Sequence, residues 1–292
     1  MAKEPPIHRP VADLAPLKND IQNILNLTRG FIEKASEINW EPGNGRLATV
    51  CRTILRRQFD SLRLISQLVE DGEGFITGSF LRLMCEEFIW SKYLAEISLP
   101  DADSLIGCIG IDEVYKCLST QDETMGRSET EKLGLLPYLE KFQNEKNDSR
   151  KEMHQLGEKL NWPDPKRIPS TLWLAEKVGE KSTYELVYRA TSRFVHFSPM
   201  ELARLVTERE PGKFSIEPAH LNLYRGSFSL YWGSLFFVCT VGLAIESPNT
   251  LKISDELVKE LDYKSILEII GERGMPPIIG IWELAPPEQW QN

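Results

Sequence analysis

The sequence GSFSLYWGSLFFVCTVGLAI, residues 226–245, holds twenty residues without a formal charge and decides the fold. Its length would let a helix cross a bilayer. However, three glycines, three serines and a threonine dilute the run, and no cluster of basic residues flanks it. We therefore expect a helix at the centre of a helical core, without stable membrane insertion. A membrane-associated protein that uses this span is the alternative.

Three stretches nearer the N-terminus have the apolar spacing of helices that could surround this run. They cover residues 14–38, 47–70 and 75–97. In the second, the apolar residues fall on one side of the helix, whereas the third is apolar on nearly every side and is expected to lie centrally in a bundle. Glycine-containing breaks at 41–45 and 71–74 separate the three helices.

The middle of the chain is more polar, and the apolar pattern loosens after Pro100. Residues 111–118 are expected to form a short helix, and residues 132–159 to contain short amphipathic pieces around Pro137. We interpret residues 101–169 as a polar excursion from the bundle.

The remaining part of the chain, residues 170–292, is expected to be helical again and to end in a proline-rich tail. The expected elements are a helix capped by Ser170 and ending near Gly179, a helix from Thr183, a helical turn over Met200–Glu208, a strand-like piece at Phe214–Ile216, the apolar helix, and a helix over Ile253–Gly271. With no repeat and no alternating pattern, the fold class is mainly α. We expect a single helical domain over residues 1–292, with the N-terminal helices in 11–100.

The composition is that of an ordinary globular protein. Its 292 residues are 41% hydrophobic, which excludes a disordered chain, and five cysteines are too few for a disulfide scaffold. The formal net charge is −9, so the chain as a whole repels nucleic acid and anionic membranes. Any polyanion partner must therefore be held by a local basic patch.

The chain shows none of the short motifs typical of nucleotide-binding, zinc-protease or hydrolase sites. The cysteines form no CxxC pair and have no histidine at metal-ligand spacing, so we expect reduced thiols, no metal and no cofactor. The first ten residues, MAKEPPIHRP, are polar and proline-rich, and we expect no signal peptide and a cytoplasmic protein.

Arg189 and His196 are the first candidate site. They are seven residues apart, about 20° around a helix and two turns along it, and Arg193 falls within about 40° of Arg189. Guanidinium groups next to an imidazole suit proton transfer beside a phosphate, because they hold the anion and stabilise its developing charge. The alternative is an exposed or ion-paired polar face.

Arg82 and Glu86 are the second candidate, on the otherwise apolar helix 75–97. The i, i+4 spacing places both side chains on one face, and a central helix would bury them at least in part. The pair is then either an internal strut or part of a polar site, depending on whether Arg189 and His196 are its neighbours.

The third candidate is a basic stripe on helix 47–70, opposite its apolar face. Arg52, Arg56 and Arg63 fall within about 40° of one another, and Phe59 lies in the same stripe. The stripe predicts either a solvated helix face or an RNA-binding surface that offers an aromatic ring for base stacking.

Several of these elements together resemble an uncharacterised family of bacterial helical proteins that is distantly HEPN-like (higher eukaryotes and prokaryotes nucleotide-binding). The resemblance spans most of the chain and rests on four short motifs: residues 80–86, 170–179, 188–196 and 276–283. Many HEPN proteins are metal-independent ribonucleases of toxin or antiphage defence systems, with an arginine, four to six residues, and then a histidine.

The resemblance implies that Arg189 and His196 are the catalytic pair of an endoribonuclease. His196 would act as general acid or base on the RNA 2′-OH or the leaving oxygen, and Arg189, with Arg193, would stabilise the phosphorane. Arg82 and Glu86 would hold the site in position. The resemblance also implies a homodimer with the site across its interface.

One position departs from the HEPN pattern. The residue after the arginine is commonly polar in these nucleases, and here it is Ala190. Some HEPN domains only bind or dimerise. The second hypothesis is therefore a non-catalytic helical interaction or regulatory module with a partner protein in a multi-protein defence system.

Overall fold

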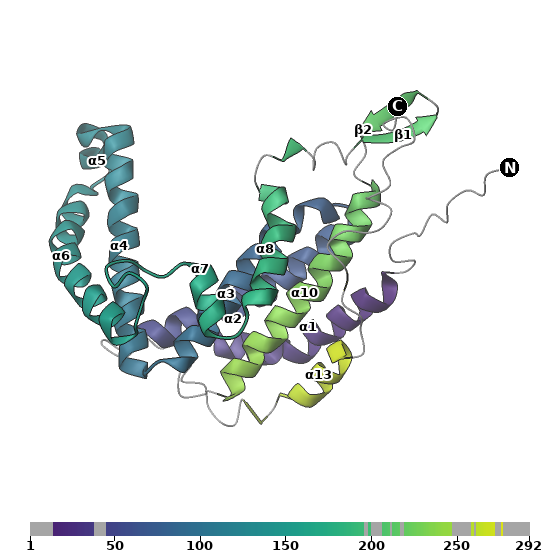
Figure 1. Ribbon diagram of the computed structural model, residues 1–292, viewed down its shortest axis with the longest axis horizontal. Helices are drawn as coiled ribbons and strands as arrows, with labels where there is room; N and C mark the ends of the chain where they lie inside the picture. The colour runs from purple at the N-terminus through teal and green to yellow at the C-terminus, as the bar shows by residue number, and fades with distance from the viewer. Residues whose placement is uncertain are drawn as a thin grey trace.

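The structure is a computed structural model that describes residues 14–37, 45–195, 198–199, 206–210, 212–216, 219–246, 258–259, 261–271 and 276. Over these ranges the protein is a helical bundle with one small antiparallel β-hairpin (Figure 1). The elements are α1 (Ala15–Ala35), α2 (Arg46–Glu70), the 3-10 turn η1 (Gly74–Ile76), α3 (Gly78–Glu96), α4 (Leu99–Met125), α5 (Arg127–Lys132), α6 (Leu136–Lys159), α7 (Thr171–Lys177), α8 (Lys181–Val195), β1 (Val206–Glu210), β2 (Lys213–Ile216), α10 (Ala219–Glu246) and α13 (Tyr263–Gly271).

The apolar run lies in α10, which packs against α1, α2, α3 and α13. Phe236 and Phe237 are fully buried, and their ring centroids lie 5.6 Å from that of Phe88 on α3 and 5.9 Å from that of Phe59 on α2, respectively. Within the described ranges, α10 is the one helix long and apolar enough to span a bilayer, and most of that span is buried by its neighbours. The predicted central helix is therefore confirmed.

The three predicted N-terminal helices are also present, as α1, α2 and α3. The predicted third helix begins later, at Gly78, because Gly74–Ile76 form the turn η1, which is fixed to α10. The Phe75 N–H donates to Oδ1 of Asn222 at 3.0 Å. A β-carbon at Gly74 would overlap the backbone carbonyl oxygen of Asn222, so the close approach of turn and helix requires glycine.

Replacing Gly74 by alanine should lower the free energy of unfolding by about 1–3 kcal/mol, because η1 and the α10 backbone must separate. Gly30→Ala is the matched control. Gly30 is exposed on α1 with open space around it, so alanine should raise the free energy of unfolding by about 0.5–1 kcal/mol. Urea unfolding followed by circular dichroism measures both. Equal effects of the two substitutions would contradict the packing argument.

Residues 99–159 form a helical arm that projects from the bundle in Figure 1. The helix predicted at 111–118 is present but is much longer than predicted, since α4 runs unbroken from Leu99 to Met125. Ser98 caps its start by accepting the Asp101 N–H at 3.3 Å. Of the short pieces predicted at 132–159, residues 136–159 form the single helix α6, because Pro137 falls in its first turn, where proline is tolerated, whereas Lys132 ends α5.

The two helices of the arm support each other, which explains why weakly amphipathic sequences are helical there. Leu105 and Cys108 of α4 and Met153 and Leu156 of α6 are buried in the hydrophobic core. The Ser149 hydroxyl donates to the Cys108 carbonyl at 3.3 Å. Each helix thus buries a narrow stripe against the other and leaves its remaining surface polar.

Among the described residues after 169, one prediction is wrong, and residues 200–205 of the predicted helical turn lie outside the described residues. Ser170 caps α7 as predicted, and the strand-like piece is β2, but residues 206–208 belong to strand β1 and not to a helical turn. The hairpin forms because Gly212, with φ of +78°, provides the turn between two strands that register Val206 against Ile216. Of the predicted helix 253–271, the described part includes α13, and residues 253–257 lie outside the described residues.

Candidate functional site

Helix α8 carries Arg189 and packs against α3 and α7. Val187, Ala190 and Thr191 are buried, while Arg189 is exposed. Among the described residues, none forms an ion pair or a hydrogen bond with the Arg189 side chain. His196 lies outside the described residues, and Arg193 belongs to α8 without a described side chain. The Arg189–His196 pair therefore stays a prediction.

Arg82 and Glu86 form the ion pair that their spacing predicts. The Arg82 Nε donates to Glu86 Oε1 at 3.0 Å, and the two side chains are 26% and 34% exposed. The pair is thus half-buried, at the surface where α3 meets α8. Partial burial disfavours the charged guanidinium, but the hydrogen bond that Arg82 donates to Glu86 and the negative charge of that carboxylate together outweigh burial and hold the pKa of Arg82 above its ordinary value.

Tyr188 connects this pair to α8. The guanidinium carbon of Arg82 lies 4.6 Å from the centroid of the Tyr188 ring, within cation–π range. The Tyr188 ring in turn lies 5.4 Å from that of Tyr184, whose pKa is raised by burial. The structure therefore places Arg82 of α3 against Tyr188 of α8. Tyr188 is the residue that precedes Arg189 in the chain.

Sequence reasoning missed the two tyrosines, although their i, i+4 spacing indicates that they share a helix face. The face they form could not be matched to Arg82 from sequence, because that contact joins residues more than a hundred positions apart.

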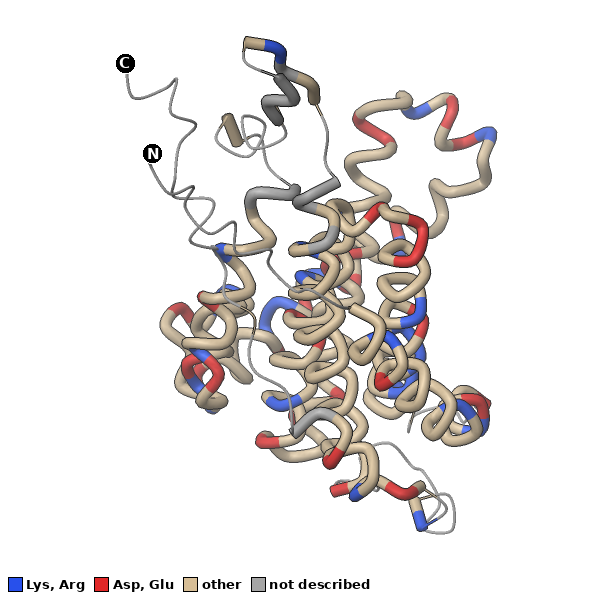
Figure 2. Tube along the Cα trace, turned by 90° about the vertical axis from the view of Figure 1, so that its right-hand side faces the viewer, with Lys and Arg blue, Asp and Glu red and all other residues tan. Residues whose placement is uncertain are grey.

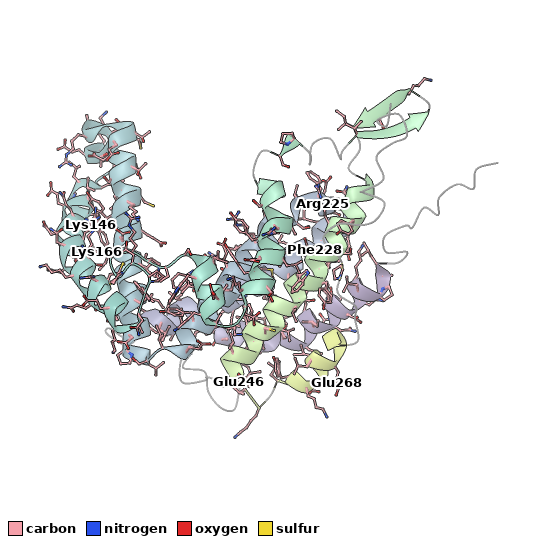
Figure 3. The ribbon with its side chains drawn as sticks, in the orientation of Figure 1. Lys146, Lys166, Arg225, Phe228, Glu246 and Glu268 are labelled. Carbon is pink, nitrogen blue, oxygen red and sulfur yellow. The ribbon has the colours of Figure 1, made fainter. Side chains whose placement is uncertain are left out.

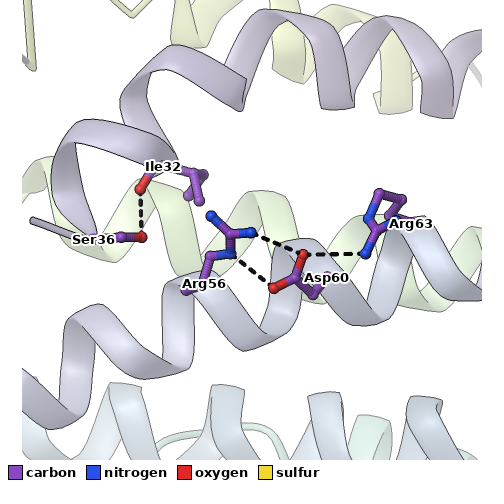
Figure 4. A network of polar contacts seen from close by, with 5 residues as sticks. All are labelled: Ile32, Ser36, Arg56, Asp60 and Arg63. Atoms are coloured by element: carbon purple, nitrogen blue, oxygen red, sulfur yellow. Dashed lines mark hydrogen bonds and ion pairs between the residues drawn. The ribbon is translucent and has the colours of Figure 1, made fainter.

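The basic stripe on α2 is present, but its charges are engaged locally (Figure 4). The Nε of Arg56 donates to Asp60 at 2.7 Å, and Arg63 lies 3.6 Å from the other oxygen of the same carboxylate. Arg52 donates to the Glu37 carbonyl at 2.8 Å. The expectation that Phe59 is available for base stacking is wrong, because its ring is buried against Phe237. The stripe thus has the character of a solvated helix face.

The described helices carry both signs of charge along their length, as Figure 2 shows.

Among comparisons with known proteins, the sequence model of a family of unknown function, DUF5677, matches residues 48–214. The chain belongs to DUF5677. No curated protein and no solved structure matches it. The DUF5677 match extends from α2 to β2, so it includes Arg82, Glu86, Arg189 and His196 and excludes the central helix α10.

A second polar group within the DUF5677 match is a buried carboxylate that sequence reasoning did not select. Glu87 of α3 is 6% exposed and contacts the guanidinium of Arg57 on α2. It faces an apolar groove of about 470 Å³ between α2, α3 and α4, lined also by Trp90, Leu94 and Ile106. Burial raises the pKa of Glu87 to about 7, although Arg57 acts in the opposite direction.

The described residues contain no group of three histidine, cysteine or acidic side chains that could hold a metal ion. The five cysteines are free thiols, as predicted. Burial raises the pKa of Cys51 to about 12 and that of Cys239 to about 11, which keeps both protonated and unreactive near neutral pH. Polar chemistry in this DUF5677 member is therefore best sought at the α3–α8 surface.

Proposed function

We propose that the protein is a HEPN-like, metal-independent endoribonuclease that cleaves RNA by attack of its 2′-OH. The observation that carries this proposal is the exposed Arg189, with no partner among the described residues, on a helix fixed to α3 by Arg82 and Tyr188. Surface arginines without an acidic partner are suited to binding phosphate. In this proposal His196, seven residues after Arg189 in the sequence, is the acid–base group that RNA cleavage requires.

In the proposed reaction, the 2′-oxygen attacks the adjacent phosphorus as His196 removes its proton. The bond from phosphorus to the 5′-oxygen then breaks, and that oxygen takes up a proton. Arg189, with Arg193, stabilises the negative charge that develops on the phosphoryl oxygens. The products are a 2′,3′-cyclic phosphate and a 5′-hydroxyl.

Arg82 and Glu86 have a different role in this proposal. The Arg82 guanidinium is already engaged by Glu86 and by the face of Tyr188, so it is a poor candidate for direct phosphate binding. We assign the pair a positioning role, in which it holds the turn of α8 that carries Arg189 against α3.

The setting of the activity follows from the same resemblance. We propose a cytoplasmic homodimer in a bacterial toxin or antiphage defence system, with the site at the dimer interface.

The test is incubation of the purified protein with labelled single-stranded RNA in excess EDTA, followed by analysis of the product ends. We expect fragments that end in a 2′,3′-cyclic phosphate. A preparation made identically from cells without the gene controls for contaminating ribonuclease. Absence of cleavage, or products with a 3′-hydroxyl, would contradict the proposal.

A specific observation favours the second candidate, a non-catalytic interaction or regulatory module with a partner protein. Ala190 is buried against the bundle, so this chain lacks the polar residue that commonly follows the arginine in HEPN nucleases. A stable complex with one partner protein, together with no RNA cleavage under the conditions above, would support this candidate.

A further inference from the structure

The arm contains a concave basic surface that the proposed cleavage does not use. We call it the basic groove: a cavity of about 730 Å³ bounded by α4, α6 and the connection at residues 166–168. Its lining residues include the cations Lys116, Lys146, Arg150, Lys151, Lys166 and Arg167, and one carboxylate, Asp112. In a chain with a net charge of −9, this concentration of cations marks a site for an anion.

Three of the six cations are neutralised locally. Lys116 lies 2.6 Å from Asp112, Lys151 lies 3.1 Å from Asp148, and Arg167 lies 3.5 Å from Asp164. The other three, Lys146, Arg150 and Lys166, have no ion pair with any described residue. The Lys146 ammonium lies 3.6 Å from the ring centroid of Tyr115, which holds that cation in place.

These three cations lie on two sides of the basic groove. Lys146 and Arg150 are four residues apart on α6, on one face of the helix, whereas Lys166 comes from the connection after it. Figure 3 shows Lys146 and Lys166 next to each other. His154 continues the α6 row by one more turn, so the row extends about 12 Å along the helix. Its Nδ1 is buried and has no hydrogen-bond partner among the described residues.

The spread of these groups indicates an extended ligand. A single phosphate would need donors that converge on one point, whereas Lys146 and Arg150 are about one turn apart on α6 and Lys166 lies on a different segment of the chain. Backbone-tracking cations of this kind are typical of sites for single-stranded nucleic acid.

We propose that the basic groove binds the phosphodiester backbone of single-stranded RNA and docks the substrate on the protein. The choice of RNA as the ligand rests on the proposed function, whereas the anionic character of the ligand rests on the groove itself. The arm thereby provides the local basic patch that an acidic chain needs in order to hold a polyanion.

The test measures binding of a fluorescent 2′-O-methyl RNA oligonucleotide by anisotropy, because this probe cannot be cleaved through a 2′-OH. The triple variant Lys146→Glu, Arg150→Glu, Lys166→Glu should bind at least about tenfold more weakly at low salt. Three lost phosphate contacts should also reduce the slope of log affinity against log salt by about 2. Lys141→Glu, an exposed substitution elsewhere on α6, should leave the affinity within twofold of wild type.

A single Lys166→Glu variant, outside the α4 and α6 helices, repeats the test where the triple variant does not fold. Wild-type RNA affinity in the folded variants would overturn the proposal. ATP binding as tight as RNA binding would also overturn it, because the groove would then be a site for a small anion. If the variants lose RNA binding and the wild-type protein does not cleave RNA, the proposal for the basic groove holds and the proposed nuclease activity is contradicted. If the wild-type protein cleaves RNA and the variants bind RNA as tightly as wild type, the nuclease activity holds and the proposal for the basic groove is contradicted.

Discussion

Substitution of His196 by alanine should reduce the rate of RNA cleavage by about 10²–10⁴-fold, the contribution expected of a positioned general acid or base. Arg189→Gln should reduce it by about 10²–10³-fold, because a neutral amide cannot stabilise the charge on the phosphorane. The double variant should lose less than the product of the two effects, since the two residues serve one transition state.

Single-turnover cleavage in EDTA measures these losses without a contribution from product release. His8→Ala and Arg29→Gln are the matched controls: His8 lies in the proline-rich first ten residues, and Arg29 is exposed on α1, away from α8. Both should retain the wild-type rate. Thermal unfolding of each variant separates loss of activity from loss of fold. A wild-type rate in His196→Ala would remove this residue from the mechanism and leave the interaction module as the better hypothesis.

The sequence was sufficient to predict those helices whose burial is strong. In α2, residues such as Leu55, Leu62 and Ile65 are each at most 1% exposed and recur at helical spacing. In α10 the apolar residues surround the helix, because neighbours pack on several of its sides. Large buried area fixes both kinds of helix, and the pattern of buried residues is visible in the sequence.

The arm could not be predicted in the same way, because its stability is shared between α4 and α6. Ile109 and Val114 of α4 are partly or largely exposed, and the buried contacts of α4 reach residues about forty positions further along the chain. Strand β1 was missed for a related reason. Val206–Glu210 is a short, charged segment that is a strand only because β2 pairs with it.

The candidate site divides along the same line between local and distant contacts. The Arg82–Glu86 pair follows from i, i+4 spacing on one helix and was predicted. The stacking of Arg82 on Tyr188 depends on how α3 and α8 meet, and no local pattern encodes it. The two ion pairs of Asp60 with Arg56 and Arg63 are also local, at i, i+4 and i, i+3 spacing, so Asp60 counts against the RNA-binding interpretation of the α2 stripe from the sequence onward.

Glu87 leads to the second large effect, a loss of stability as the pH rises. Its pKa of about 7 in the folded protein exceeds the ordinary value of 4.5, so the folded state binds a proton more tightly than the unfolded state. Between about pH 4.5 and 7 the folded state retains this proton and the unfolded state does not, and the free energy of unfolding falls with rising pH. Over that pH range the free energy of unfolding should fall by about 3 kcal/mol. Below about pH 4.5 and above about pH 7, the contribution of Glu87 to the free energy of unfolding no longer changes with pH.

Glu87→Gln should remove this pH dependence and raise the free energy of unfolding at pH 8 by about 3 kcal/mol, because a neutral amide replaces a carboxylate that burial disfavours. Below pH 4.5 the variant and the wild type should be similarly stable. Urea unfolding at intervals from pH 4 to 8 measures both curves, and Glu33→Gln, at an exposed carboxylate on α1, is the matched control. A Glu87→Gln variant that is less stable than wild type at pH 8 would mean that the contact with Arg57 outweighs the cost of burying the carboxylate.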